Sequence, residues 1–227
     1  MFYDELSNRQ GARSPLKIRE IHPSYLWRFG VQRIFHRTYP ETPLLTSSAV
    51  ILLDNWLKPT DLGLEYGSGR STIWIARRIA KLTTVEHEAV WFNRVQQKIA
   101  HSGLSGKIDY RLIPTNGGQM DEPYDHPYAL VADEMEDTSL DFVLIDGQMR
   151  LRCLERALPK LKSGGLLVLD GANRYVPNSF ESKHTTIQLF RDEPLDGEWR
   201  EILSLLRPWR WINTTDGLWD TRLWVKP

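Results

Sequence analysis

Residues 62–74 read LGLEYGSGRSTIW, and this stretch decides the fold class. An apolar run leads into two glycines, Gly67 and Gly69, and a helical pattern begins directly after them. A carboxylate, Glu65, stands two residues before the first of these glycines. Strand, glycine turn and helix in this order predict the opening unit of an α/β sheet, in which ligands bind at the end of the strand.

The glycine turn differs from the two common phosphate-binding patterns. The dinucleotide fingerprint requires a third glycine where this chain has Thr72, and a P-loop requires a lysine that the turn lacks. Glu65 would repel a pyrophosphate, whereas it suits a ligand that carries positive charge. A turn that uses glycine only for backbone freedom explains the stretch taken alone equally well.

Short apolar strands and amphipathic helices alternate along the rest of the chain. Strands are expected at 61–66, 81–87, 107–113, 139–146 and 164–170, and helices at 71–82, 89–100 and 149–162. Gly164 and Gly165 are expected to end the last of these helices. The alternation predicts a doubly wound, Rossmann-like, mostly parallel sheet with helices on both faces. Two extended runs, 210–215 and 221–226, flank DGLWD and predict a C-terminal antiparallel hairpin.

The N-terminal part has a different character, and we assign residues 1–60 to an arm and cap helix and 61–227 to the α/β domain. Four prolines among the first 45 residues interrupt any long helix, so the fold of this arm stays open. Ser47 or Ser48 is expected to cap a helix that Pro59 closes.

Composition indicates a small partner and a reducing compartment. The chain has 29 basic and 29 acidic residues, so no overall field draws it to nucleic acid or to a membrane. We see no apolar leader or membrane span, and a single cysteine, Cys153, is expected to pack as a small hydrophobe. These features predict a cytoplasmic protein and leave its oligomeric state open.

A second carboxylate, Glu86, ends the second predicted strand. The first two strands of such a unit are neighbours, so Glu86 is expected to reach the crevice beside the glycine turn. There it can accept both hydrogens of a ribose diol, and each hydrogen bond to a charged acceptor contributes roughly 1.5–3 kcal/mol.

Together these features resemble the class I S-adenosylmethionine-dependent methyltransferases. The resemblance spans residues 61–227 and rests on LEYGSGRST, TVEH, DFVLIDG, RALPKLKSGGLLVLD and the terminal hairpin, in that order. It implies S-adenosylmethionine as cofactor and methyl transfer to an oxygen or nitrogen atom of a small molecule.

The resemblance also implies roles for the residues of the glycine turn. Glu65 and the backbone of Gly67, Ser68 and Gly69 would hold the methionine part of the cofactor. Glu86 would take the ribose hydroxyls.

Further cofactor contacts follow from the same resemblance. His87 would lie against the adenine, or else simply end its strand at the surface. Ser71 and Thr72 would bind the methionine carboxylate, cap the helix, or do both. Asn116 is the one candidate after the third strand for the adenine amino group.

Two aspartates end later strands and are candidates for the reacting centre. Asp146 ends the fourth strand, and three roles stay open: general base, contact to the methionine amine, or helix cap. Asp170 ends the fifth strand. The pair is similar to the metal-dependent catechol-type methyltransferases, but Gly171 and Met149 stand where those enzymes have asparagine and lysine. We therefore expect no metal.

Other polar and aromatic residues are candidates for binding the acceptor, and a solvated or core position explains each of them as well. They are Arg150, Arg152, Asn173, Arg174, Tyr175, His36, His126, His184, Trp27, Trp56 and Trp74.

Three other classes of protein are alternatives to a methyltransferase. An aminopropyltransferase uses a related cofactor, but its loop usually holds more consecutive glycines. An oxidoreductase is disfavoured by Thr72 and by the terminal hairpin. A non-catalytic binding protein of the same fold stays open, because the cofactor motifs say nothing about the acceptor site.

Overall fold

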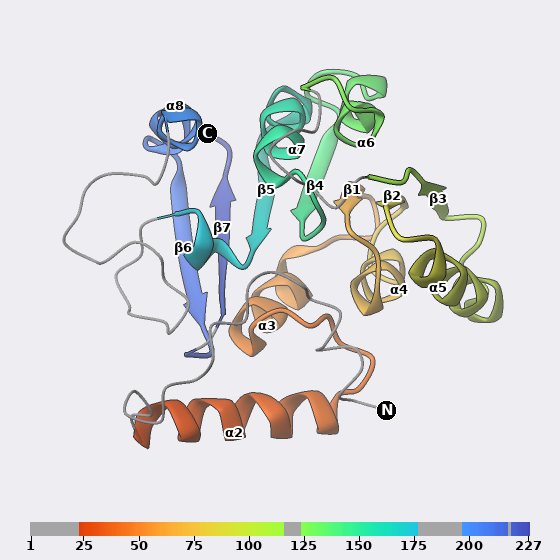
Figure 1. The fold of residues 1–227 in the computed structure, drawn as a ribbon. Helices are drawn as coiled ribbons and strands as arrows, with labels where there is room; N and C mark the ends of the chain where they lie inside the picture. Colours follow the sequence, from red (N-terminus) through yellow and green to blue (C-terminus); the bar gives the residue numbers. More distant parts are fainter. Residues whose placement is uncertain (1–22, 116–123, 177–196, 218) are drawn as a thin grey trace.

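The computed structural model describes residues 23–115, 124–176, 197–217 and 219–227, and a seven-stranded sheet forms its centre (Figure 1). The strands are β1 (Leu62–Tyr66), β2 (Lys81–Glu86), β3 (Ile108–Leu112), β4 (Leu140–Ile145), β5 (Leu161–Asp170), β6 (Arg210–Thr215) and β7 (Asp220–Val225). The helices are α2 (Pro23–Thr38), α3 (Ser47–Trp56), α4 (Arg70–Ala76), α5 (Ala89–Ser102), α6 (Pro127–Leu130), α7 (Arg150–Ala157) and α8 (Gly197–Leu206). Short 3-10 turns lie at η2 (Val131–Glu134), η3 (Leu158–Lys160) and η4 (Ala172–Arg174).

The strand order is β3-β2-β1-β4-β5-β7-β6. The first five strands pair in parallel, and β7 runs antiparallel between β5 and β6. The order reverses between β1 and β4, which is where doubly wound sheets bind ligands. The predicted fold class, with its C-terminal antiparallel hairpin, is confirmed.

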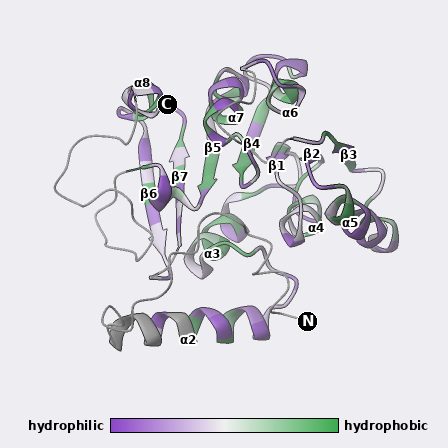
Figure 2. Ribbon diagram, viewed as in Figure 1, coloured by the Kyte–Doolittle hydropathy of each residue, from purple (hydrophilic) through white to green (hydrophobic). Residues whose placement is uncertain are grey.

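Both faces of the sheet are covered, because alternate residues of each central strand point to opposite sides. Val143 and Ile145 of β4 pack in a core beneath α6, α7 and α8, while Phe142 and Leu144 pack in a second core with α3, α4 and α5. In Figure 2 the hydrophobic colour gathers along β4 and β5. None of the helices within the described ranges is long and apolar enough to cross a membrane.

The N-terminal segment is more regular than its prolines suggested. Pro23 is the first residue of α2, where its missing N–H costs no helical hydrogen bond, and the helix ends before Pro40. The cap of α3 is Thr46, whose hydroxyl accepts from Ala49 N–H, so the expected capping by Ser47 or Ser48 is wrong. Both serines lie inside the helix instead.

The chain between α7 and β5 also departs from the prediction. The helix ends at Ala157 and gives way to a 3-10 turn that contains Pro159, and β5 begins at Leu161. Gly164 and Gly165 therefore lie within the strand and do not end the helix. Cys153 is fully buried, as expected for a small hydrophobe.

A buried set of threonines ties the N-terminal segment to the hairpin and to the end of β5. The hydroxyls of Thr46 and Thr214 lie 2.5 Å apart, and the Thr214 hydroxyl donates to the carbonyl oxygen of Thr221. The Thr221 hydroxyl donates to Asp170 Oδ1 at 2.9 Å. This chain of hydrogen bonds holds the start of α3 against the carboxyl ends of the central strands.

Tyr66, the last residue of β1, offers a test of the core. Its fully buried hydroxyl donates to Ala129 O at 2.9 Å and accepts from Ala132 N–H at 3.0 Å. Tyr66→Phe should lower the free energy of unfolding by about 1–3 kcal/mol, because both backbone groups lose their buried partner. Urea denaturation measures this loss, and Tyr39→Phe at a half-exposed position is the matched control. Equal stability of the two variants would contradict the prediction.

Candidate functional site

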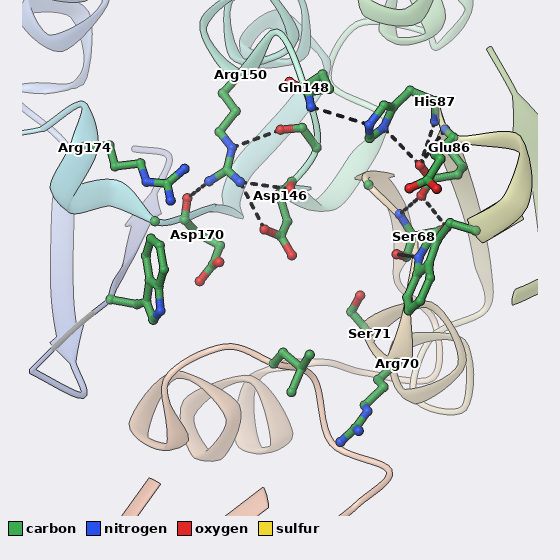
Figure 3. Close-up of a pocket in the computed structure, with 18 of the residues that line it drawn as sticks. Ser68, Arg70, Ser71, Glu86, His87, Asp146, Gln148, Arg150, Asp170 and Arg174 are labelled. Carbon is green, nitrogen blue, oxygen red and sulfur yellow. Dashed lines mark hydrogen bonds and ion pairs between the residues drawn. The ribbon is translucent and has the colours of Figure 1, made fainter. Parts of the chain in front are cut away.

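A cavity of about 520 Å³ opens at the carboxyl ends of the central strands (Figure 3). It is lined by residues from these strand ends and the loops that follow them, together with one residue from the segment before α3: Leu44, Gly67, Ser68, Gly69, Arg70, Ser71, Glu86, His87, Glu88, Trp91, Asp146, Gly147, Gln148, Arg150, Asp170, Gly171, Arg174, Tyr175 and Trp219. The cavity lies at the reversal of strand order and has the volume of a small-molecule site.

Two glycines from neighbouring strand ends form the floor between β1 and β4. Gly67 has φ +89°, and a Cβ atom there would lie 2.7 Å from Gly147 N. The two backbones approach so closely that a side chain at residue 67 would collide with backbone atoms. The glycine predicted from the motif therefore serves both the turn and this contact.

Glu86 is the best-connected acid of the site, and only 2 % of it is exposed. Its Oε2 accepts from the Ser68 N–H and hydroxyl, and its Oε1 accepts from the backbone N–H groups of His87 and Glu88. Burial acts to raise the pKa of Glu86, but hydrogen bonds from His87, Glu88 and Ser68 outweigh it and hold the pKa below its ordinary value. The side chain is therefore a carboxylate at neutral pH.

Ser68, the middle residue of the glycine turn, is held from three elements. Besides its bonds to Glu86, its hydroxyl lies 2.7 Å from the hydroxyl of Tyr110 on β3. The indole N–H of Trp91 on α5 donates to its carbonyl oxygen at 2.8 Å. The turn is thus fixed before any ligand binds.

His87 joins the ends of β2 and β4. Its Nδ1 lies 2.9 Å from Glu86 Oε1, and Gln148 Nε2 lies 3.4 Å from its Nε2. The ring also meets Tyr128 edge-on. His87 faces the cavity, as its expected adenine contact requires, and that contact stays a prediction.

Glu65 and Thr72 lie beneath the glycine turn and do not line the cavity. Strand alternation points Glu65 toward α4, where its Oε2 accepts from the hydroxyls of Thr72 and Thr84 at 2.6 and 2.7 Å. The Thr72 hydroxyl accepts in turn from Gly69 N–H. The structure thus connects both residues to the cavity through the backbone of the turn. Ser71, at the same helix start, is buried and does line the cavity.

Asp146 and Asp170 lie together at the ends of β4 and β5, as the sequence predicted for two strand-end carboxylates (Figure 3). Asp170 is buried and accepts from Thr221. The N-cap of α7 is Met149, in a left-handed conformation, which removes Asp146 from the cap position proposed as one of its roles. The base and cofactor-contact roles stay predictions.

Arg150 joins these two strand ends. Its guanidinium donates to the carbonyl oxygens of Gly147, Asp146 and Asp170 and to the Asp146 carboxylate at 3.2 Å. A Cβ atom at Gly171, which has φ +61°, would lie 3.0 Å from Arg150 Nη1. Glycine stands where the catechol-type enzymes have asparagine, and it leaves room for this arginine.

The metal pattern of those enzymes is not assembled within the described residues, where no three His, Cys, Asp or Glu side chains form a metal-binding group. Asn173, three residues after Asp170 and one of the acceptor-binding candidates, is fully buried and accepts from Asp220 N–H through its Oδ1. Its side chain holds the start of β7.

Several acceptor candidates lie elsewhere. Arg152 pairs with Glu155 and Glu198, and His126 caps α6 by accepting from Tyr128 N–H. His36 contacts Gln32 and Thr42 within the N-terminal segment. Trp27 and Trp56 are largely exposed and Trp74 is buried, and none of the three lines the cavity. Asn116 and His184 fall outside the described residues.

Sequence reasoning missed the two tryptophans that do line the cavity, Trp91 and Trp219, and the roles of Tyr110 and Gln148. A signal was present for Trp91, which follows shortly after Glu86 at the start of a predicted helix. Trp219 lies in the hairpin turn, and only the antiparallel placement of β7 beside β5 brings it to the site. Arg174, by contrast, lines the cavity as expected and stacks on Trp219, its side chain 4.5 Å from the ring centre.

No protein-family model matches the sequence, and no curated protein matches it significantly. Solved structures do match. An O-methyltransferase from Bacillus cereus, in complex with SAH, is 16% identical with a TM-score of 0.54, and the match covers 98% of this chain and 96% of that one. The O-methyltransferase TomG from Streptomyces achromogenes, involved in tomaymycin synthesis and solved with SAM, is 16% identical with a TM-score of 0.53 over 92% of each chain.

A methyltransferase from Geobacter sulfurreducens is 12% identical with a TM-score of 0.53, over 99% of this chain and 95% of that one. At such identities the likeness concerns the fold. The chain has the class I methyltransferase fold that its motifs led us to expect.

Arg150→Gln should lower the free energy of unfolding by about 2–4 kcal/mol, because three backbone carbonyls and a carboxylate lose a charged donor in a site where the side chain is only 13% exposed. Arg152→Gln, two residues further along α7, breaks only partly exposed pairs and should cost less than about 1 kcal/mol. Chemical denaturation of both variants checks the difference. Similar costs would show that Arg150 does not hold the strand ends together.

Glu65 provides a pH-dependent test. Burial raises its pKa to about 7, the hydroxyls of Ser71, Thr72 and Thr84 act against this shift, and the charge of Asp146 adds to it. Since the folded protein holds this proton more tightly than the unfolded chain, the neutral form stabilises the fold at low pH. That contribution is lost as the pH rises through about 7.

Relative to Glu65→Gln, the wild type should therefore lose about 3 kcal/mol of unfolding free energy between about pH 5 and pH 8. Denaturation curves at both pH values measure this difference. Glu136→Gln, at an exposed position, is the control and should show no such trend. A difference that does not change with pH would refute the role of burial at Glu65.

Proposed function

We propose that the protein is an S-adenosylmethionine-dependent methyltransferase that acts on a small molecule. The observation that carries the proposal is the buried, ionised Glu86 at the end of β2, facing a cavity of about 520 Å³ beside a preformed glycine turn. The two O-methyltransferase structures with bound SAM or SAH support this proposal, and their class favours a hydroxyl oxygen as acceptor over a nitrogen.

The residues present fit this cofactor. A carboxylate at Glu86 suits a ribose diol, and the carboxylates of Asp146 and Asp170 suit a ligand with positive charge. Four donors already use the acceptor positions of Glu86. Only the Ser68 hydroxyl among them can rotate away, and Tyr110 offers it another partner 2.7 Å away. We infer that this hydroxyl yields its place to the ribose.

The proposed contacts follow the walls of the cavity. Glu86 and His87 would hold the nucleoside end, while the backbone of Gly67, Ser68 and Gly69, with Ser71, would hold the methionine end. Glu65 and Thr72 would act from below by holding the turn in shape. When bound, the cofactor supplies an activated methyl group on a sulfonium.

Transfer of that group is a single in-line displacement, so the chain's main task is to position the acceptor and exclude water. Leu44, Tyr175 and Trp219 supply apolar surface to the wall of the cavity that Asp146 also lines. A hydroxyl acceptor loses a proton as the new bond forms, and Asp146 is our candidate to receive it. We propose residues 1–60, whose described part supplies Leu44, as an N-terminal arm and cap helix, and residues 61–227 as the cofactor-binding domain.

Calorimetry with S-adenosylhomocysteine tests the proposed class directly. We expect binding of S-adenosylhomocysteine and none of NAD, and the reverse would refute the proposal. Turnover of decarboxylated cofactor with putrescine would instead identify an aminopropyltransferase. To identify the acceptor, S-adenosylmethionine is incubated with each of a panel of hydroxylated and amine compounds, and formation of S-adenosylhomocysteine is measured. Cofactor binding with no turnover on any compound would favour a non-catalytic protein.

Glu86→Gln is the sharpest single change for the cofactor site. The amide keeps the size of the side chain but loses the charge and one acceptor oxygen, so S-adenosylhomocysteine should bind about 10–100-fold more weakly. Titration calorimetry measures the dissociation constant, and circular dichroism verifies the fold. Glu134→Gln, an exposed acid on η2, is the control. Unchanged affinity in Glu86→Gln would remove Glu86 from the proposed site.

A further inference from the structure

A second cavity, of about 460 Å³, shares Arg70 with the first, and half of its lining residues are basic. Arg70 and Arg77 come from the start and the end of α4, and Lys98 and His101 come from one face of α5. We call these four residues the basic groove. Pro40, Glu41, Ile73 and Ser102 complete its wall.

The charge of the groove is strongly one-sided in a protein whose total charge is zero. Glu41 is the single acid in its lining, and its Oε2 lies 3.8 Å from Arg77 Nη1. Both side chains are highly exposed, at 71% and 48%, so this pair is weak and easily replaced by a stronger anion. Among the described residues no carboxylate forms an ion pair with Lys98.

The groove has the chemistry of a phosphate site. Arginine presents several N–H donors in a plane, and lysine adds a compact charge, a combination that suits the oxygens of a phosphate. The volume of the second cavity, about 460 Å³, is larger than a single carboxylate group requires. The neutral total charge of the chain argues against a long polyanion as its ligand.

Arg70 connects this groove to the first cavity, because it lines both cavities. A molecule with one end near Asp146 and a charged group in the groove would therefore pass Arg70. We propose that the acceptor is a phosphorylated small molecule whose phosphate binds in the basic groove while its methyl-accepting end enters the first cavity. This inference rests on the proposed methyltransferase function.

The test uses the full chain, with inorganic pyrophosphate as probe. Arg77→Gln combined with Lys98→Gln removes two charges from exposed positions that do not line the first cavity. Lys81→Gln combined with Arg200→Gln removes the same two charges from exposed positions elsewhere. Pyrophosphate should bind the wild type and the control variant with equal affinity. It should bind the groove variant at least about tenfold more weakly. No binding, or equal loss in both variants, would overturn the site.

Binding of S-adenosylhomocysteine, measured on the same samples, separates the two proposals. It should be equal in all three proteins, and its absence in all of them would refute the methyltransferase function while leaving the pyrophosphate result to stand. With a methyl acceptor in hand, the groove variant should raise the acceptor KM at least about tenfold and affect kcat much less. An unchanged acceptor KM would show that the groove holds free phosphate, and would overturn its assignment to the acceptor.

Discussion

The site depends on one buried carboxylate. Glu86 binds the N–H and the hydroxyl of Ser68 and so fastens the glycine turn of β1 to the end of β2. The charge persists in spite of burial because four protein donors replace the water that the carboxylate has lost. Since those donors come from the strand end and the turn, losing the charge would loosen both at once. The same group that shapes the empty cavity is the one proposed to anchor the ribose.

Glu65 shows how the same carboxyl chemistry serves another purpose in another environment. It lies one strand away from Glu86 and is more deeply buried, but it accepts from side-chain hydroxyls alone. Burial raises the pKa of Glu65 to about 7, because hydroxyls compensate for the lost water less fully than several backbone N–H groups do. Glu65 therefore supports the turn from below, and Glu86 faces the cavity.

The part of the cavity that we propose for the acceptor is lined by segments that are far apart in the chain. Arg150 holds the ends of β4 and β5 at a fixed spacing, and Gly171 leaves room for it. Thr221 of the hairpin and Thr46 before α3 then tie the N-terminal segment and β7 to Asp170. Because these contacts connect the N-terminal segment to the last strand, Leu44 and Trp219 face one cavity, and a change in either segment alters the space left for an acceptor.

The sequence alone determined the succession of strands and helices along the chain, the place of the glycine turn and the strand-end acids Glu86 and Asp146. These depend on local periodicity and on residues that precede or follow a strand directly, which a single chain displays openly. Alternation along a strand also explains why Glu65 lies below the turn, although the motif alone suggested direct contact with the ligand.

Only the tertiary structure decided which distant residues meet at the site. Trp219 is brought in by antiparallel pairing of β7 with β5, and Arg150 turns back to three carbonyls that no sequence pattern marks. The end of α7 before Pro159, with Gly164 inside β5, follows from where β5 pairs with β4. Such contacts join residues far apart along the chain, so their geometry is set by sheet pairing and helix packing and is invisible to spacing.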